Sequence, residues 1–140
     1  MKPEVIADTS ALVALFNPAD LYHEWAVAQA RELTASLLTC EAVVTESLHL
    51  LRRVPGGGDV LMDFWERGEL DLAFAAKDHV SRLRELQRKF SSVPMSFADA
   101  CLVRMSEFRT RAVIWTADAD FRIYRRQGRE IIPLLAPAGL

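Results

Sequence analysis

The chain has 140 residues, of which 51% are hydrophobic and 26% are charged, and its formal net charge is −2. This length suits one ordinary domain, and the composition is too apolar for an intrinsically disordered chain. The small negative charge excludes a global basic field that attracts nucleic acid, although 14 of the 17 basic residues are Arg, the residue best suited to bidentate phosphate contacts.

Five short apolar runs predict strands, and most lack strict alternation, which is typical of strands covered on both faces. Helical patterns lie between them, and Pro and Gly mark several boundaries. In chain order we expect a strand at Glu4–Ala7, helices at Ser10–Phe16 and Asp20–Leu33, a strand at Ser36–Cys40, helices at Glu41–Arg53 and Val60–Arg67, a strand at Leu70–Phe74, helices at Lys77–Phe90 and Phe97–Phe108, and strands at Ala112–Thr116 and Glu130–Leu135. This alternation predicts an α/β fold with a mainly parallel sheet, in a single domain over residues 1–140.

Two cysteines, Cys40 and Cys101, lie in apolar surroundings without a CxxC partner. We expect both to be buried free thiols, which suits a reducing, cytoplasmic setting. No signal-peptide pattern opens the chain, and its longest uncharged run, Thr9–Ala19, is too short to span a bilayer. We therefore expect no membrane association.

Two aspartates follow predicted strands, at the edge where open α/β sheets bind ligands. Asp8 ends the first strand, and Asp118 comes shortly after the strand that ends at Thr116. Each has an ordinary structural alternative, because Asp8 suits the N-cap of the next helix and Asp118 suits an acidic surface turn.

Two further acids lie on predicted helices. Glu46 falls at the rim of an apolar stripe, where a carboxylate is partly desolvated, although a solvated rim glutamate is the simpler alternative. Asp99 stands three residues after Ser96, in the pattern of a capping box.

All four acids can converge at one edge of a parallel sheet. Two carboxylates about 4 Å apart repel by roughly 4 kcal/mol at an effective dielectric near 20. Such a group needs a cation or shared protons, and oxygen-only ligands indicate Mg²⁺ or Mn²⁺ rather than zinc.

The ordered set of motifs resembles the PIN-domain ribonuclease family. It comprises "DTS" from Asp8, Glu46 in a helix, "FADACLV" around Asp99 and "TADADF" around Asp118. In particular, the chain looks like the toxin of a VapBC-type toxin–antitoxin pair. The resemblance implies a three-layer α/β/α fold with about five strands, and cleavage of single-stranded RNA that leaves 5′-phosphate and 3′-hydroxyl ends. It also implies a small antitoxin partner and a homodimer.

Site residues follow from the same resemblance, position by position. Asp8, Glu46, Asp99 and Asp118 match the catalytic acids, with Asp8, Asp99 and Asp118 as ligands of Mg²⁺ or Mn²⁺. The supporting positions are Thr9, Ser10, Thr116 and Asp120.

A basic segment follows the last acidic motif. Arg122, Arg125, Arg126 and Arg129 are candidate RNA contacts, and Tyr124 among them is a candidate for stacking on a base. A solvated basic surface is the alternative for this segment.

Other functions remain open at this point. The chain can be a PIN-like module that binds RNA or protein without catalysis, or a housekeeping RNA-processing PIN nuclease. A receiver or phosphotransfer domain also places Asp after the first strand. That reading is disfavoured, because Ser10 stands where a second Asp is needed and no late Lys follows a strand.

Overall fold

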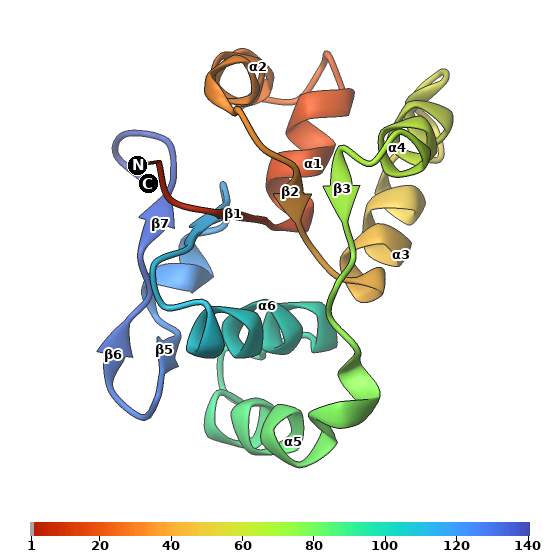
Figure 1. Ribbon diagram of the computed structural model, residues 1–140. Helices are drawn as coiled ribbons and strands as arrows, with labels where there is room; N and C mark the ends of the chain where they lie inside the picture. The colour runs from red at the N-terminus through yellow and green to blue at the C-terminus, as the bar shows by residue number, and fades with distance from the viewer. Residues whose placement is uncertain (1) are drawn as a thin grey trace.

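A five-stranded parallel sheet forms the centre of the molecule, with helices on both sides (Figure 1). The computed structural model describes residues 2–140. The strand order is β3-β2-β1-β4-β7, and every neighbouring pair is parallel. The strands are β1 (Val5–Ala7), β2 (Leu37–Leu38), β3 (Leu70–Asp71), β4 (Val113–Trp115) and β7 (Leu134–Leu135). The predicted three-layer α/β fold is confirmed.

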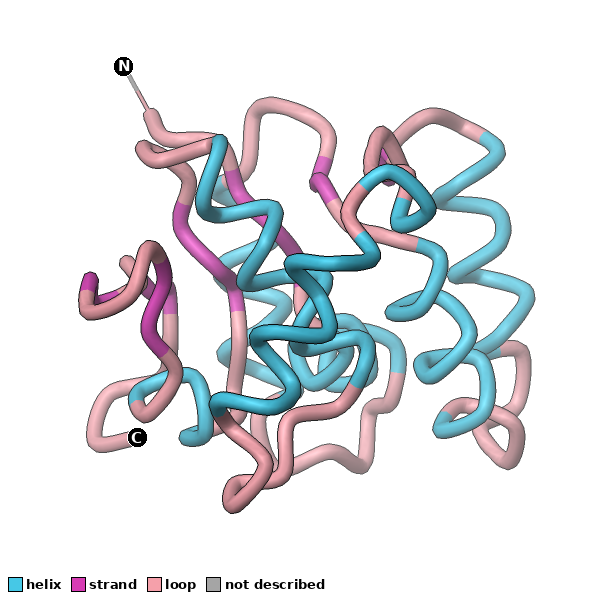
Figure 2. The backbone as a smooth tube through the Cα atoms, turned by 90° about the horizontal axis from the view of Figure 1, so that it is seen from below, coloured by secondary structure: helices cyan, strands magenta, loops and turns pink. Residues whose placement is uncertain are grey.

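Six α-helices cover the sheet and, with the loops, make up most of the chain (Figure 2). They are α1 (Thr9–Phe16), α2 (His23–Glu32), α3 (Glu41–Leu50), α4 (Gly57–Glu66), α5 (Val80–Lys89) and α6 (Phe97–Phe108), with short 3₁₀ helices η1 (Ala76–Asp78) and η2 (Ala119–Arg122). Helices α1 and α2 lie on one side of the strands, and α6 lies on the other with α5 outside it (Figure 1). None of these helices is long and apolar enough to cross a membrane.

Strands β1 and β4 determine where the functional groups emerge. All three residues of β1 are buried, as expected for a strand covered on both faces. Ala7 pairs with Trp115, so Asp8 and Thr116 leave the sheet side by side. The Asp8 N–H extends the ladder by donating to the Trp115 carbonyl at 3.0 Å. The carboxyl ends of the two central strands therefore present their next residues to the same space.

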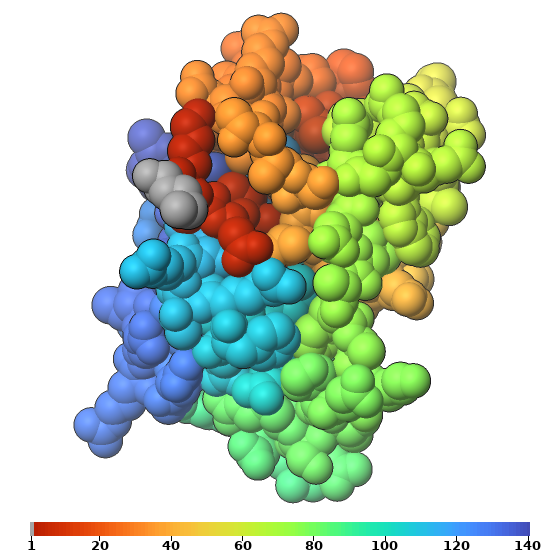
Figure 3. Space-filling view, in the orientation of Figure 1, coloured from red at the N-terminus to blue at the C-terminus, as the bar shows by residue number. Residues whose placement is uncertain are grey.

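The last predicted strand is wrong as a single element. Residues Glu130–Ile131 form β6, which pairs antiparallel with β5 (Arg125–Arg126), and only Leu134–Leu135 join the main sheet. The β5–β6 hairpin protrudes at the lower left of the molecule (Figure 3). Pro133 lies between β6 and β7, where its missing N–H interrupts a continuous ladder.

Several helix boundaries also differ from the sequence prediction, among them the start of α2 at His23 and the end of α3 at Leu50. Helix α4 begins at Gly57, inside the glycine run, after Gly56 adopts the left-handed conformation with φ 70°. The run predicted as one helix from Lys77 divides into η1 and α5, with His79 between them. By contrast, α6 spans Phe97–Phe108 as predicted.

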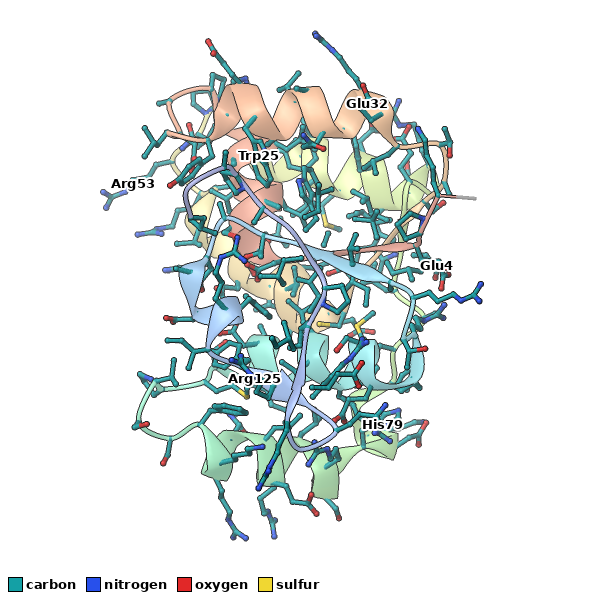
Figure 4. The ribbon with its side chains drawn as sticks, turned by 90° about the vertical axis from the view of Figure 1, so that its left-hand side faces the viewer. Glu4, Trp25, Glu32, Arg53, His79 and Arg125 are labelled. Atoms are coloured by element: carbon teal, nitrogen blue, oxygen red, sulfur yellow. The ribbon has the colours of Figure 1, made fainter. Side chains whose placement is uncertain are left out.

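Both cysteines are buried and free, in agreement with the sequence prediction. Among the three tryptophans, Trp115 is fully buried, and the side chain of Trp25 on α2 (Figure 4) approaches it with ring centroids 6.1 Å apart. Trp65 on α4 is 37% exposed. Trp25 and Trp115 therefore belong to the packing of the α2 side of the sheet.

Candidate active site

The four candidate acids lie at the carboxyl edge of the sheet and influence one another electrostatically. Asp8 follows β1, Glu46 lies on α3, Asp99 lies in the first turn of α6, and Asp118 follows β4. The charge of Asp118 acts on the other three acids, and that of Asp8 acts on Asp99. The structure therefore brings together residues that are far apart in the chain.

Asp8 is the most buried of these acids, with 3% of its surface exposed. Its Oδ2 accepts hydrogen bonds from the Ser10 hydroxyl at 2.7 Å and the Thr116 hydroxyl at 2.8 Å. Asp8 occupies the N-cap position of α1, but its side chain makes no capping hydrogen bond. The structural alternative of helix capping therefore does not account for this carboxylate.

The two hydroxyls also tie the segment after β4 to Asp8. Ser10 Oγ accepts from the Ala117 N–H, and Thr116 Oγ1 accepts from the Asp118 N–H, both at 2.9 Å. Because each hydroxyl accepts a backbone N–H and donates to the same carboxylate oxygen, the orientation of Asp8 depends on the backbone at 117–118. Ser10 and Thr116 thus lie where supporting groups of this acid are expected.

Asp118 serves partly as the acid of a turn, which was the alternative for it. Its Oδ1 accepts from the Asp120 N–H at 2.9 Å and caps η2. Burial, and then the charge of Asp118, raise the pKa of Asp120. The turn directs Asp118 toward the other acids and places Asp120 at their margin.

The capping motif before α6 is only half formed. Ser96 Oγ accepts from the Asp99 N–H at 3.0 Å, which caps the helix. The Asp99 carboxylate instead accepts the hydroxyl of Tyr124 through Oδ2 at 2.8 Å. Ser96 is therefore the helix cap, and Asp99 is left for another role.

Burial and repulsion by neighbouring carboxylates raise the pKa values of Asp8 and Asp99. Burial raises the pKa of Asp8 to about 6, against opposing hydrogen bonds from Ser10 and Thr116, and the charge of Asp118 adds to the rise. Burial and the charge of Asp8 raise the pKa of Asp99 to about 6. The ordinary value for both is 3.8. A site with these pKa values favours a compensating cation.

Glu46 completes the acidic group from the side of α3. It is half-buried, and burial, followed by the charges of Asp99 and Asp118, raises its pKa. A fully solvated rim glutamate is therefore wrong for this position. A carboxylate with a raised pKa is suited to accept a proton during a reaction near neutral pH.

The oxygen atoms near the acids are suitable ligands for a divalent cation, although the side chains are not arranged around a single metal position. Within residues 2–140, no group of three or more His, Cys, Asp or Glu side chains is positioned to hold a metal as it stands. The available donors are carboxylate and hydroxyl oxygens, which Mg²⁺ and Mn²⁺ prefer. The buried Thr9 Oγ1 makes no hydrogen bond of standard geometry within residues 2–140, but it lies close enough to Glu46 to oppose the rise in the pKa of that carboxyl. Thr9 therefore adds a hydroxyl oxygen beside the acids, where water or a cation can complete its hydrogen bonding.

A groove of about 840 Å³ opens beside Glu46. It runs between α3, the segment around η1 and the start of α6. Its lining includes His49 and Lys77, and Phe97, which is 48% exposed. Of the four acids only Glu46 lines this groove, which therefore extends from Glu46 along a partly apolar surface large enough for a nucleotide-sized group.

The basic segment does not form one exposed patch. Arg126 is 2% exposed, and its guanidinium donates to the carbonyls of Ser106 at 2.7 Å and Thr110 at 3.0 Å. The prediction that Arg126 contacts RNA is therefore wrong, because its donors hold the end of α6. Arg122 and Arg129 are exposed.

The remaining arginine, Arg125, lies on β5 (Figure 4). It is half-buried, and its Nη1 donates to the carbonyls of Arg122, Ile123 and Tyr124. Much of its hydrogen-bonding capacity is therefore used within its own turn.

Tyr124 is fully buried, so the prediction that it stacks on a base is wrong. The sequence reasoning missed its contact with Asp99. The available signal was the spacing of Phe121 and Tyr124, which places two aromatic side chains three residues apart directly after the acidic motif.

Comparison with known proteins agrees with the fold. The sequence profile of the PIN domain matches residues 5–127. No curated protein matches the chain by sequence. The fold is similar to that of VapC20 from Mycobacterium tuberculosis, described as a toxin that cleaves the sarcin–ricin loop. The TM-score is 0.70 at 21% identity, over 84% of this chain and 92% of that chain.

Proposed function

The chain belongs to the PIN-domain family, a family of nucleases, and we propose that it is a Mg²⁺- or Mn²⁺-dependent endoribonuclease for single-stranded RNA. The observation that carries the proposal is the grouping of Asp8, Glu46, Asp99 and Asp118 at the carboxyl edge of the sheet, where burial first and the charges of neighbouring acids second raise the pKa values of Asp8, Glu46 and Asp99. A non-catalytic fold has no need to keep these like charges together, because apolar side chains would stabilise the same positions.

We assign different roles to the acids according to their surroundings. Asp8 after β1, Asp99 in the first turn of α6 and Asp118 after β4 would hold the cation, because their charges act on one another. When bound, the cation would neutralise the phosphodiester charge and make a water more acidic. Ser10 and Thr116 keep the Asp8 carboxylate in one orientation through Oδ2. Glu46, with its raised pKa, would accept a proton from the attacking water.

The surroundings of the acids offer two places for RNA. The groove beside Glu46 has the half-exposed ring of Phe97 and the ammonium group of Lys77 along it. Arg122 and Arg129 are exposed after the last acidic turn. An aromatic face and scattered cations are what single-stranded RNA requires, because its bases stack and its phosphates are anionic.

We further propose that the chain is the toxin of a type II toxin–antitoxin pair, acting in the cytoplasm as one PIN-like domain. The likeness in fold to VapC20 supports this assignment. A small antitoxin and a second copy of the chain would then be its partners. Exposed apolar side chains on α4, among them Val60, Met62 and Trp65, offer a surface for such contacts.

Cleavage of a labelled single-stranded RNA tests the enzymatic proposal. We expect cutting with Mg²⁺ or Mn²⁺, no cutting with EDTA, and at least about a 100-fold loss in Glu46→Gln if Glu46 transfers a proton. Glu24→Gln, at an exposed glutamate of α2 that does not line the groove, is the matched control and should keep its activity. Binding of RNA without cleavage in any divalent cation would instead support the non-catalytic alternative.

A further inference from the structure

Tyr124 lies directly beneath the acidic site and is held there by aromatic packing. It stands between η2 and β5 and is fully buried. Its ring meets Phe90 edge-on at 5.4 Å and Phe121 edge-on at 5.2 Å between centroids. Its N–H donates to the Asp120 carbonyl at 3.1 Å. Ring and backbone are therefore both restrained, which gives the hydroxyl a defined position.

The hydroxyl uses that position to contact one acid. It donates to Asp99 Oδ2 at 2.8 Å, across two segments that are far apart in the chain. A phenolic hydroxyl is protonated near neutral pH, so it acts as the donor in its hydrogen bond to the carboxylate.

A carboxylate at the start of a helix is not restrained by its own chain alone. The terminal torsion of Asp is broad, so the plane of the group turns easily unless a partner holds one oxygen. Asp8 has such partners, because Ser10 and Thr116 both hold its Oδ2. Tyr124 supplies the equivalent restraint for Asp99 from the opposite side of the site.

We propose that Tyr124 is a positioning residue of the active site, whose hydroxyl holds Asp99 Oδ2 so that Oδ1 is presented to the divalent cation. This inference rests on the proposed metal-dependent function. Hydrogen bonds to the outer atoms of metal ligands orient those ligands, and their loss typically lowers metal affinity or activity by about 10–100-fold. The competing explanation is that Asp99 merely satisfies a buried hydroxyl, in which case the contact serves packing.

Tyr124→Phe tests the proposal, because it removes the hydroxyl and keeps the ring between Phe90 and Phe121. Mn²⁺ affinity is measured without RNA, by calorimetry and by the electron paramagnetic resonance signal of free Mn²⁺. We expect the dissociation constant to rise about 10-fold or more. The Mg²⁺ concentration for half-maximal cleavage should rise in parallel, with much of the rate recovered at saturating Mg²⁺. Tyr22→Phe, at the only other tyrosine of the chain, should change neither quantity.

A second variant separates positioning from packing. Phe90→Leu loosens the contact with the Tyr124 ring but leaves the hydroxyl in place, so it should lower the melting temperature and leave Mn²⁺ affinity near that of the wild type. Tyr124→Phe with wild-type Mn²⁺ affinity would overturn the inference and leave the proposed function standing. Wild-type protein that cuts RNA in EDTA and binds no Mn²⁺ would overturn both.

Discussion

Asp8 shows how one buried carboxylate is prepared for a functional role. Two hydroxyls hold its Oδ2, and each is held in turn by a backbone N–H after β4. This arrangement limits motion without removing charge, because hydroxyl donors stabilise the ionised form less than a cation does. The pKa of about 6 shows that burial prevails over these hydrogen bonds. The residue therefore carries an uncompensated energetic penalty in the cation-free chain.

Asp8→Asn should relieve that penalty and abolish function. Asn keeps the size of Asp, and its carbonyl oxygen can accept the hydroxyls of Ser10 and Thr116. We expect the melting temperature at pH 7.5 without divalent cation to equal or exceed that of the wild type, while RNA cleavage is lost. Asp59→Asn, on the exposed side of α4, should keep cleavage intact. A melting temperature several degrees lower for Asp8→Asn would show that the charge itself stabilises the fold.

In the β5–β6 hairpin, the contacts of the basic side chains differ most from those expected from the sequence. Arg126 on β5 holds the end of α6 through the carbonyls of Ser106 and Thr110, and it pairs with Glu130 on β6. Nearby, Glu107 of α6 accepts the guanidinium of Arg82 from α5 at 2.6 Å. Some basic residues in this region therefore hold elements of the fold together. Only the exposed ones are available to bind the phosphates of RNA.

The arginines should accordingly separate into two classes. Arg122→Gln combined with Arg129→Gln should weaken RNA binding across sequences and flatten its salt dependence by roughly 0.7 in the log–log slope for each lost phosphate contact. The catalytic rate on bound RNA should change little. Arg126→Gln should instead lower the melting temperature, because it leaves buried carbonyls without donors.

Two exposed arginines on other segments of the chain supply a matched control. Arg31 is at the end of α2, and Arg111 precedes β4, and both are exposed. Gln at these two positions removes the same charge, and should leave RNA affinity and its salt slope unchanged. An equal loss of affinity in this pair would indicate a general charge effect, and the proposed contacts at Arg122 and Arg129 would be wrong.

Across the whole molecule, acids with opposite behaviour determine how stability depends on pH. Asp8 and Asp99 have folded pKa values of about 6, against an ordinary 3.8. Burial raises the pKa of Glu107, but hydrogen bonds from Arg82, the Gln127 N–H and Arg104 prevail and lower it to about 2, against an ordinary 4.5. Asp8 and Asp99 therefore stabilise the fold at low pH, and Glu107 stabilises it above its ordinary pKa.

We expect the cation-free protein to become less stable as the pH rises from 5 to 7. In that range the folded chain binds more protons at Asp8 and Asp99 than the unfolded chain, so raising the pH favours unfolding. Glu107 is ionised in the folded chain throughout this range and largely ionised in the unfolded chain, so its opposing slope is small and vanishes as the pH rises. Thermal melting should show a fall of several degrees, at roughly 4 °C per kcal/mol. Saturating Mg²⁺ should reduce the fall, because a cation favours the ionised acids. A melting temperature that does not change with pH in the absence of cation would contradict the raised pKa values of Asp8 and Asp99.

By itself, the sequence predicted the parallel α/β architecture, the span of α6 and the approach of four acids to one another at one edge of the sheet. These features depend on local patterns, since apolar runs, helical spacing and an acid directly after a strand are readable within a few residues. Only the tertiary structure decided the roles of Arg126 and Tyr124, and the division of the last predicted strand. Arg126 and Tyr124 look like exposed contacts in the sequence, but residues far away in the chain bury them: the end of α6 takes the guanidinium, and Phe90 and Asp99 enclose the tyrosine. A side chain's partners depend on which distant segments pack against it, and no local pattern records that choice.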